Sequence, residues 1–201
     1  VGMAQMVAAG QHVAVLLPGA HRPRGITDLL AGSLAPQGVR VTTCMELADL
    51  LLCVPEQAPE GTAARLAAVR AAWRALAATA PAGLGLVLLP RQMECLSFRA
   101  YGSSAWRAAL CAADWLDPGL RLQVEQSWDC LVLDHYGSTE SAFAGAVQCR
   151  CREGRHVRAL DLLLEIVHPV TGKVLPAGET GELVITTLQR RAMPLLRYRT
   201  G

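Results

Sequence analysis

Lysine and aromatic residues are scarce in this sequence of 201 residues. Lys173 is the single lysine among 19 basic residues, so a catalytic lysine could occupy only that position. Phenylalanine, tyrosine and tryptophan together make up 4% of the chain. Hydrophobic residues nevertheless reach 52% and charged residues only 18%, which excludes a disordered chain, because such chains are polar and highly charged.

A surplus of basic charge and long apolar runs are also missing. The net charge is +2, and the nearest approach to a basic patch, residues 189–191, is interpreted as solvated surface, so we predict no nucleic-acid partner. No uninterrupted apolar run reaches the length of about 18 residues that a membrane span needs. Residues 1–10 lack a basic segment, which argues against a signal peptide. Seven cysteines without a framework spacing favour reduced thiols and a cytoplasmic location.

The first two thirds of the sequence predict alternating strands and helices. Short apolar runs closed by Gly or Pro predict strands, and apolar residues at helical spacing predict helices. The predicted strands are 12–19, 38–44, 50–55, 83–90, 107–116 and 130–137, and the predicted helices are 3–9, 26–35, 46–49, 61–80 and 118–128. This alternation favours crossover units and a mainly parallel sheet, whereas residues 90–105 support no prediction.

The sequence changes character after residue 145. Strand-like runs there are separated by the turn pairs Thr171-Gly172 and Ala177-Gly178, which predicts antiparallel β structure. We therefore predict an α/β fold, with a mainly parallel sheet and flanking helices followed by an antiparallel β segment. The predicted division is 1–145 and 146–201.

The segment "YGSTE", residues 136–140, groups the side chains of a nucleotide site. Tyr136 offers a flat face for a nucleobase, and Gly137 lets the backbone approach a ligand closely. Thr139 offers a hydroxyl donor to a phosphate, and Glu140 an oxygen ligand for Mg²⁺. On these residues alone, a polar turn closed by a capping Ser or Thr is an equally good interpretation.

Three motifs in order make the chain resemble the adenylate-forming superfamily of acyl- and aryl-CoA ligases. They are "YGSTE", "GKVLPAGETGELVITTL" at 172–188 and "YRTG" at 198–201. Within this superfamily the chain is most similar to phenylacetate-CoA ligases and the related deazaflavin-adenylating synthetases. The resemblance spans about 10–55 and 106–201, and it implies part of the large N-terminal domain of such an enzyme.

The resemblance implies a role for each matching position. Tyr136 would stack on adenine, with Asp134 or His135 near its exocyclic amine, while Thr139 and Glu140 would be the catalytic residues, contacting the α-phosphate and Mg²⁺. Arg199 would lie near the ribose and phosphate. The implied nucleotide-binding positions are Ala113, Asp114, Asp134, His135, Tyr136, Gly137, Ser138, Thr139 and Arg199.

The implied reaction activates a carboxylic acid, of an aryl or arylacetic kind. The carboxylate attacks the α-phosphorus of ATP, pyrophosphate leaves, and coenzyme A then attacks the acyl-adenylate. Positioning and charge stabilisation would supply most of the catalysis. ATP or AMP, Mg²⁺ and coenzyme A are the expected cofactors and co-substrates, a small carboxylic acid is the expected partner, no membrane partner is expected, and a homodimer is also considered.

Several parts of the superfamily pattern are absent from these 201 residues. No Ser/Thr/Gly-rich phosphate loop is found, the Asp expected after Gly201 is missing, and Lys173 lies in a predicted hairpin turn. We therefore expect a fragment of a larger enzyme that does not catalyse adenylation by itself. The alternative is a non-catalytic module that binds adenine nucleotides or a protein partner.

The cysteines suggest two further sites. Cys149, Cys151 and His156 could bind zinc with Cys95 or Cys111 as a fourth ligand, although buried free thiols beside a surface histidine explain them as well. Cys130 and His135 would point to opposite faces of a strand, which argues against a nucleophilic pair.

Overall fold

The computed structural model describes residues 11–20, 22–23, 25–52, 62–79, 83–97 and 106–201. The predicted helix at 3–9, the end of the predicted strand at 50–55 and residues 98–105 of the segment 90–105 lie outside these residues.

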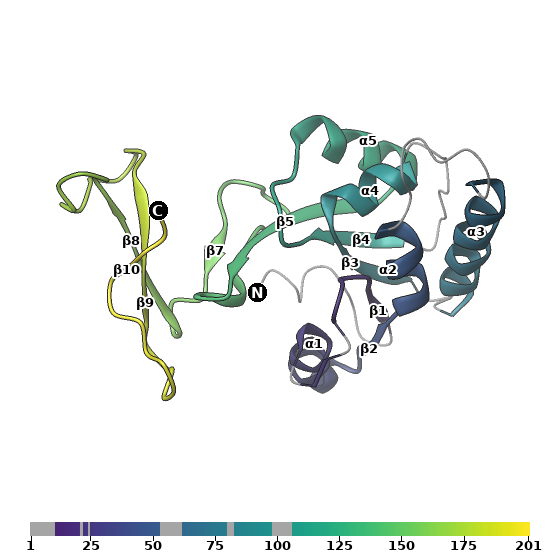
Figure 1. The fold of residues 1–201 in the computed structure, drawn as a ribbon, viewed down its shortest axis with the longest axis horizontal. Coiled ribbons are helices and arrows are strands. Elements are labelled where there is room, and N and C mark those ends of the chain that lie inside the picture. Colours follow the sequence, from purple (N-terminus) through teal and green to yellow (C-terminus); the bar gives the residue numbers. More distant parts are fainter. Residues whose placement is uncertain (1–10, 21, 24, 53–61, 80–82, 98–105) are drawn as a thin grey trace.

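A seven-stranded sheet forms the larger part of the molecule (Figure 1). Its strands lie in the order β2-β1-β3-β4-β5-β6-β7, and the first five are parallel. β6 and β7 continue the sheet in antiparallel pairing. The strands are β1 (His12–Val15), β2 (Arg40–Thr43), β3 (Leu84–Leu88), β4 (Trp106–Cys111), β5 (Leu131–Ser138), β6 (Ala142–Val147) and β7 (His156–Val157). The predicted α/β class is confirmed.

The parallel strands carry apolar side chains on both of their faces, so helices cover both faces of the sheet. Val13 and Val15 of β1 pack with Leu30 and Leu34 of α1 (Ile26–Leu34), which is followed by a short 3-10 turn, η2 (Ala35–Gln37). The opposite face packs against the other four helices (Figure 1). These are α2 (Met45–Leu52), α3 (Thr62–Ala78), α4 (Pro90–Ser97) and α5 (Pro118–Trp128).

The helix predicted at 61–80 is present as α3, and its larger apolar residues form a stripe that faces the core. Val69, Trp73 and Leu76 are buried, and Leu66 is half-buried. The Trp73 ring lies 4.3 Å from the Trp106 ring and 5.5 Å from that of Trp128, between ring centroids. Trp73 therefore attaches α3 to both β4 and α5.

Two predictions of local structure were wrong or incomplete. Residues 50–52, predicted as the start of a strand, continue helix α2. Their apolar run fits a buried helix face as well as a strand, and Leu51 is buried in the core. Helix α4 was not predicted; it begins at Pro90, a favoured first helical residue, and the Gln92 side chain accepts a hydrogen bond of 2.9 Å from the Leu89 N–H.

A second, antiparallel sheet has the order β10-β9-β8 and stands beside the large one (Figure 1). Its strands are β8 (Leu162–Val167), β9 (Glu182–Thr187) and β10 (Tyr198–Arg199). Gly172 and Gly178 have φ angles of 66° and 94°, which explains the glycines in the predicted turns. Antiparallel pairing begins with β6, near the predicted boundary, and the chain changes sheets between Val157 and Leu162. The division into domains at 145 stays a prediction.

None of the helices in the described part of the chain combines the length and the apolar character that crossing a bilayer requires.

Candidate functional site

The "YGSTE" segment ends strand β5 and turns tightly into β6. The pairing of β5 with β6 shifts between Tyr136 and Ser138, so Gly137 lies at an irregularity of the kind that redirects side chains near active sites. The Ser138 N–H donates to Ser141 Oγ at 2.9 Å, and the Ser141 N–H donates to Ser138 Oγ at 3.1 Å. These reciprocal bonds close the turn and hold Thr139 and Glu140 at its tip.

A cavity of about 430 Å³ opens beside this turn, at the carboxyl ends of β1, β4 and β5. Ligands of open parallel sheets bind at this edge, and the volume is within the range of small-molecule sites. Its walls combine apolar side chains from the first crossover with the residues that end β4 and β5. The lining residues are Leu17, Gly25, Ile26, Leu29, Ala112, Ala113, His135, Gly137, Ser138 and Thr139.

The structure brings five of the predicted nucleotide-binding residues to this cavity, namely Ala113, His135, Gly137, Ser138 and Thr139. Asp134 and Tyr136 alternate with His135 and Gly137 along β5, so their side chains project from the opposite face of the strand. The candidate site therefore has two sides, which are separated by β5 and joined at the turn.

Asp134 is buried and already has charged and polar partners. Its carboxylate accepts a hydrogen bond from the Arg155 guanidinium, and its N–H donates to Gln148 Oε1 at 3.2 Å. Gln148 also accepts a bond of 2.9 Å from Arg121. An adenine amine near Asp134 would share this carboxylate with Arg155.

Ala113, after β4, has a left-handed backbone with a φ of 69°, a conformation that is unfavourable for a residue with a Cβ. Such positions cluster at ligand sites. Asp114 is exposed, and its Oδ1 accepts a bond of 2.7 Å from the Trp115 N–H. Asp114 does not line the cavity, whereas Ala113 and its neighbour Ala112 do.

His135 is 7% exposed, and this burial lowers the pKa of its imidazole. The neutral ring therefore presents a polar but uncharged surface to the cavity.

Glu140 carries negative charge at the tip of the turn. Hydrogen bonds from its own backbone N–H and from the Ser138 hydroxyl lower the pKa of its carboxyl. The Tyr198 hydroxyl donates to Glu140 Oε1 at 3.4 Å, which links β10 to the turn. An ionised carboxylate of this kind fits the predicted role as a ligand of Mg²⁺.

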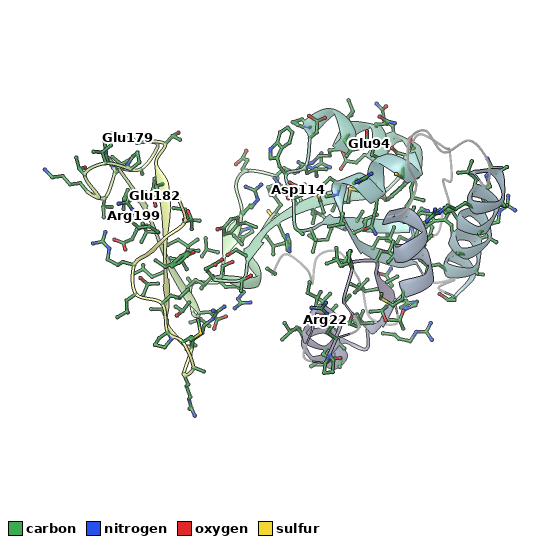
Figure 2. The ribbon with its side chains drawn as sticks, in the orientation of Figure 1. Arg22, Glu94, Asp114, Glu179, Glu182 and Arg199 are labelled. Carbon is green, nitrogen blue, oxygen red and sulfur yellow. The ribbon has the colours of Figure 1, made fainter. Side chains whose placement is uncertain are left out.

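Arg199 has its partners on the small sheet, and its implied position near the ribose and phosphate stays a prediction. Its guanidinium forms a bidentate ion pair with Glu182 and also donates to the Pro169 carbonyl. This pairing raises the pKa of Arg199 and lowers that of Glu182. Figure 2 shows both side chains together on the small sheet, away from Asp114. Adjacent strand residues face opposite ways, so Tyr198 meets Glu140 and Arg199 does not.

Sequence reasoning missed two contributors to the site. Leu17, Ile26 and Leu29 form the apolar wall of the cavity, and their position at the end of the first predicted strand and in the helix predicted after it could have identified them. Arg190 was interpreted as solvated surface, yet its Nη2 donates to the Thr139 carbonyl at 3.2 Å. No local sequence pattern identifies this contact, which spans 51 residues.

The described cysteines differ in the pKa of their thiols. Hydrogen bonds with the His156 side chain and with the Cys151 backbone lower the pKa of the Cys149 thiol to about 7. Across the described ranges, no three acidic, Cys or His side chains are arranged to hold a metal ion, and zinc binding stays a prediction. Burial raises the pKa of Cys111 and of Cys130 to about 12, in agreement with the argument against a Cys130 nucleophile.

Comparison with known proteins gives relatives that share this architecture. Phenylacetate-coenzyme A ligase of Pseudomonas putida is 42% identical over 91 residues, 44% of this chain and 20% of the relative. That of Thermus thermophilus is 41% identical over 97 residues, 47% of this chain and 21% of the relative. The chain thus spans about a fifth of the length of these curated relatives.

Solved structures extend the likeness to nearly the whole chain. A structure of 2-hydroxyisobutyryl-CoA ligase in complex with 2-HIB-AMP and CoA superposes with a TM-score of 0.69 at 19% identity, and covers 99% of this chain and 40% of that enzyme. A long-chain-fatty-acid-CoA ligase from Archaeoglobus fulgidus gives 0.59 at 13% identity, with 90% and 35% covered. These similarities establish the fold. The family model described as "AMP-binding enzyme" matches residues 7–189, and the chain therefore belongs to the AMP-binding enzyme family.

Proposed function

We propose that this chain forms the nucleotide- and acid-binding part of an enzyme that activates a carboxylic acid with ATP and transfers it to coenzyme A. The observation that carries the proposal is the locked turn at the end of β5. It holds the Thr139 hydroxyl and the Glu140 carboxylate beside a cavity of about 430 Å³. Family membership and the phenylacetate-CoA ligase relatives support the same activity.

In this proposal the two sides of β5 hold different parts of the acyl-adenylate. The Tyr136 ring supports the base on one side, and the apolar cavity on the other side receives the acid. Thr139 and Glu140 lie where the two sides meet, next to the reacting α-phosphate. Thr139 donates a hydrogen bond to the phosphate, and Glu140 would hold Mg²⁺. The metal supplies positive charge that offsets the charge of the phosphates.

The apolar wall of Leu17, Ile26 and Leu29 favours a hydrophobic acid. The neutral imidazole of His135 adds no charge to this surface. An aryl or arylacetic acid fits such a lining, and phenylacetate-CoA ligases are among the relatives.

The test is calorimetric binding of AMP and ATP to the 201-residue chain in the presence of Mg²⁺. Tyr136→Ala should weaken binding by about 1–3 kcal/mol, the range found for stacking of a base on an aromatic ring. Tyr136→Phe, which keeps the ring, should bind nearly as well as the wild type. A folded wild-type chain with no affinity for either nucleotide would contradict the proposal.

The second candidate function is a non-catalytic nucleotide-binding module. The position of Lys173, the single lysine of the chain, favours it: Lys173 is exposed in the turn between β8 and β9, on the small sheet. Nucleotide binding without any acid-dependent release of pyrophosphate would be the result expected for such a module.

A further inference from the structure

The loop between β9 and β10 brings an arginine side chain to the tip of the turn between β5 and β6, which carries Thr139 and Glu140. Arg190 lies in this loop, and its Nη2 donates a hydrogen bond of 3.2 Å to the carbonyl of Thr139. Thr139 lines the cavity, so the guanidinium sits beside the residue to which a phosphate contact is assigned. The loop joins two strands of the small sheet, whereas the turn joins two strands of the large sheet, so the two sheets meet at this contact.

The loop that carries Arg190 is fixed at its base. The buried Thr187 donates its N–H to the Leu195 carbonyl at 2.9 Å, and its Oγ1 accepts the Leu195 N–H at 2.8 Å. The Leu188 N–H donates to the Asp161 carbonyl at 2.8 Å. These bonds give the loop a defined path, so the approach of Arg190 to the turn follows from the fold.

The guanidinium also favours the ionised form of a carboxyl group in the turn. It is one of the groups that lower the pKa of the Glu140 carboxyl, after the hydrogen bonds within the turn and that from Tyr198. The bond to Thr139 uses one N–H of a planar group with five, and the side chain is only half-buried. Arginine presents the remaining donors in a geometry that suits a phosphate.

We propose that Arg190 is a phosphate-binding residue of this site and recognises the α-phosphate of the nucleotide beside Thr139. This inference rests on the proposed function, because it assigns a further residue to the same ligand. The Thr139 carbonyl holds the guanidinium near the turn. Rotation of the side-chain torsions then directs the other N–H groups to the phosphate, whose negative charge the guanidinium offsets.

The test compares AMP with adenosine, which lacks the phosphate, as ligands of the 201-residue chain by calorimetry. Arg190→Gln should lower the affinity for AMP about tenfold or more, as expected for a lost hydrogen bond to a charged group, and leave that for adenosine unchanged. Arg191→Gln, the same change at the exposed neighbouring position, should alter neither affinity. Arg190→Lys should restore part of the affinity for AMP.

Three outcomes would contradict the proposal. Equal affinities of wild type and Arg190→Gln for AMP would show that Arg190 does not contact the phosphate, while the proposed nucleotide site would remain in place. An equal loss for AMP and adenosine would show that Arg190 only supports the fold of the turn. A wild-type chain that binds neither ligand would overturn the proposed function, and this inference with it.

Discussion

At the scale of single residues, the candidate site depends on short polar contacts around one turn. Ser138 and Ser141 use their hydroxyls on each other's backbone, so the Ser138 side chain is structural as well as close to the cavity. This arrangement keeps Thr139 and Glu140 at the tip, where their side chains can face a ligand. Preorganised groups of this kind stabilise developing charge without rearranging during the reaction.

His135 should make stability depend on pH. Burial lowers its pKa in the folded state, so below the unfolded value of about 6.5 the unfolded chain binds more protons. The contribution of His135 to the free energy of unfolding is therefore fully present above about pH 6.5, and it is lost as the pH falls below this value toward the lowered pKa of the folded state. Urea unfolding at about pH 7.5 and about pH 5.5 should show a smaller difference for His135→Gln than for the wild type.

His12 should contribute to the same pH dependence. Burial and the nearby charge of Arg40 also lower its pKa, so His12→Gln should remove a further share of the pH dependence. The double variant should show the smallest difference between the two pH values. An unchanged pH dependence in His135→Gln would contradict the assignment of a neutral buried imidazole.

At the scale of elements, helices attach to the sheet through a few large side chains. Trp73 is 2% exposed and lies between Trp106 of β4 and Trp128 of α5. The remaining residues of α3 are mostly alanine, which bury little area each. One indole therefore carries much of the contact between α3 and the rest of the core.

Trp73→Ala should lower the free energy of unfolding by about 3–5 kcal/mol, because it removes a buried indole and leaves a cavity. Chemical denaturation followed by far-ultraviolet circular dichroism measures this without depending on tryptophan fluorescence. Trp115 is 68% exposed, so Trp115→Ala should change stability by no more than about 0.5 kcal/mol. A similar small effect at Trp73 would contradict the proposed attachment of α3.

At the scale of the whole molecule, the two sheets meet at the turn that follows β5. Tyr198 of β10 and Arg190 of the β9–β10 loop both contact residues of the turn. A change in the position of the small sheet would therefore alter the surroundings of Glu140. The site is built from both halves of the chain, although the cavity itself belongs to the large sheet.

The isolated 201 residues should release little pyrophosphate when given ATP and an aryl acid. The single lysine, Lys173, lies in an exposed turn and cannot supply a catalytic ammonium group at the cavity without a large rearrangement. A coupled pyrophosphate assay with phenylacetate, and with no acid as control, measures this rate. Robust acid-dependent release would contradict the prediction.

Much of the fold followed from local patterns in the sequence. The helix predicted at 118–128 is α5; in the structure Pro118 begins it, and Asp117 Oδ1 accepts a hydrogen bond of 2.9 Å from the Leu120 N–H. Residues 50–52 were assigned wrongly, because a short apolar run carries no information about period. At these residues the sequence and the structure differ because the helical conformation is selected by packing against α3 and the sheet.

Local sequence patterns specified the α/β class, the turn at the end of β5 and the residue types that a nucleotide site needs, because these depend on neighbours within a few positions. Which side chains meet became clear only from the folded arrangement of the two sheets. It paired Arg199 with Glu182, directed Tyr136 and His135 to opposite sides of β5, and brought Arg190 to Thr139. Such contacts join residues that lie far apart along the chain, and the strand alternation and loop paths that create them exist only after the sheets have formed.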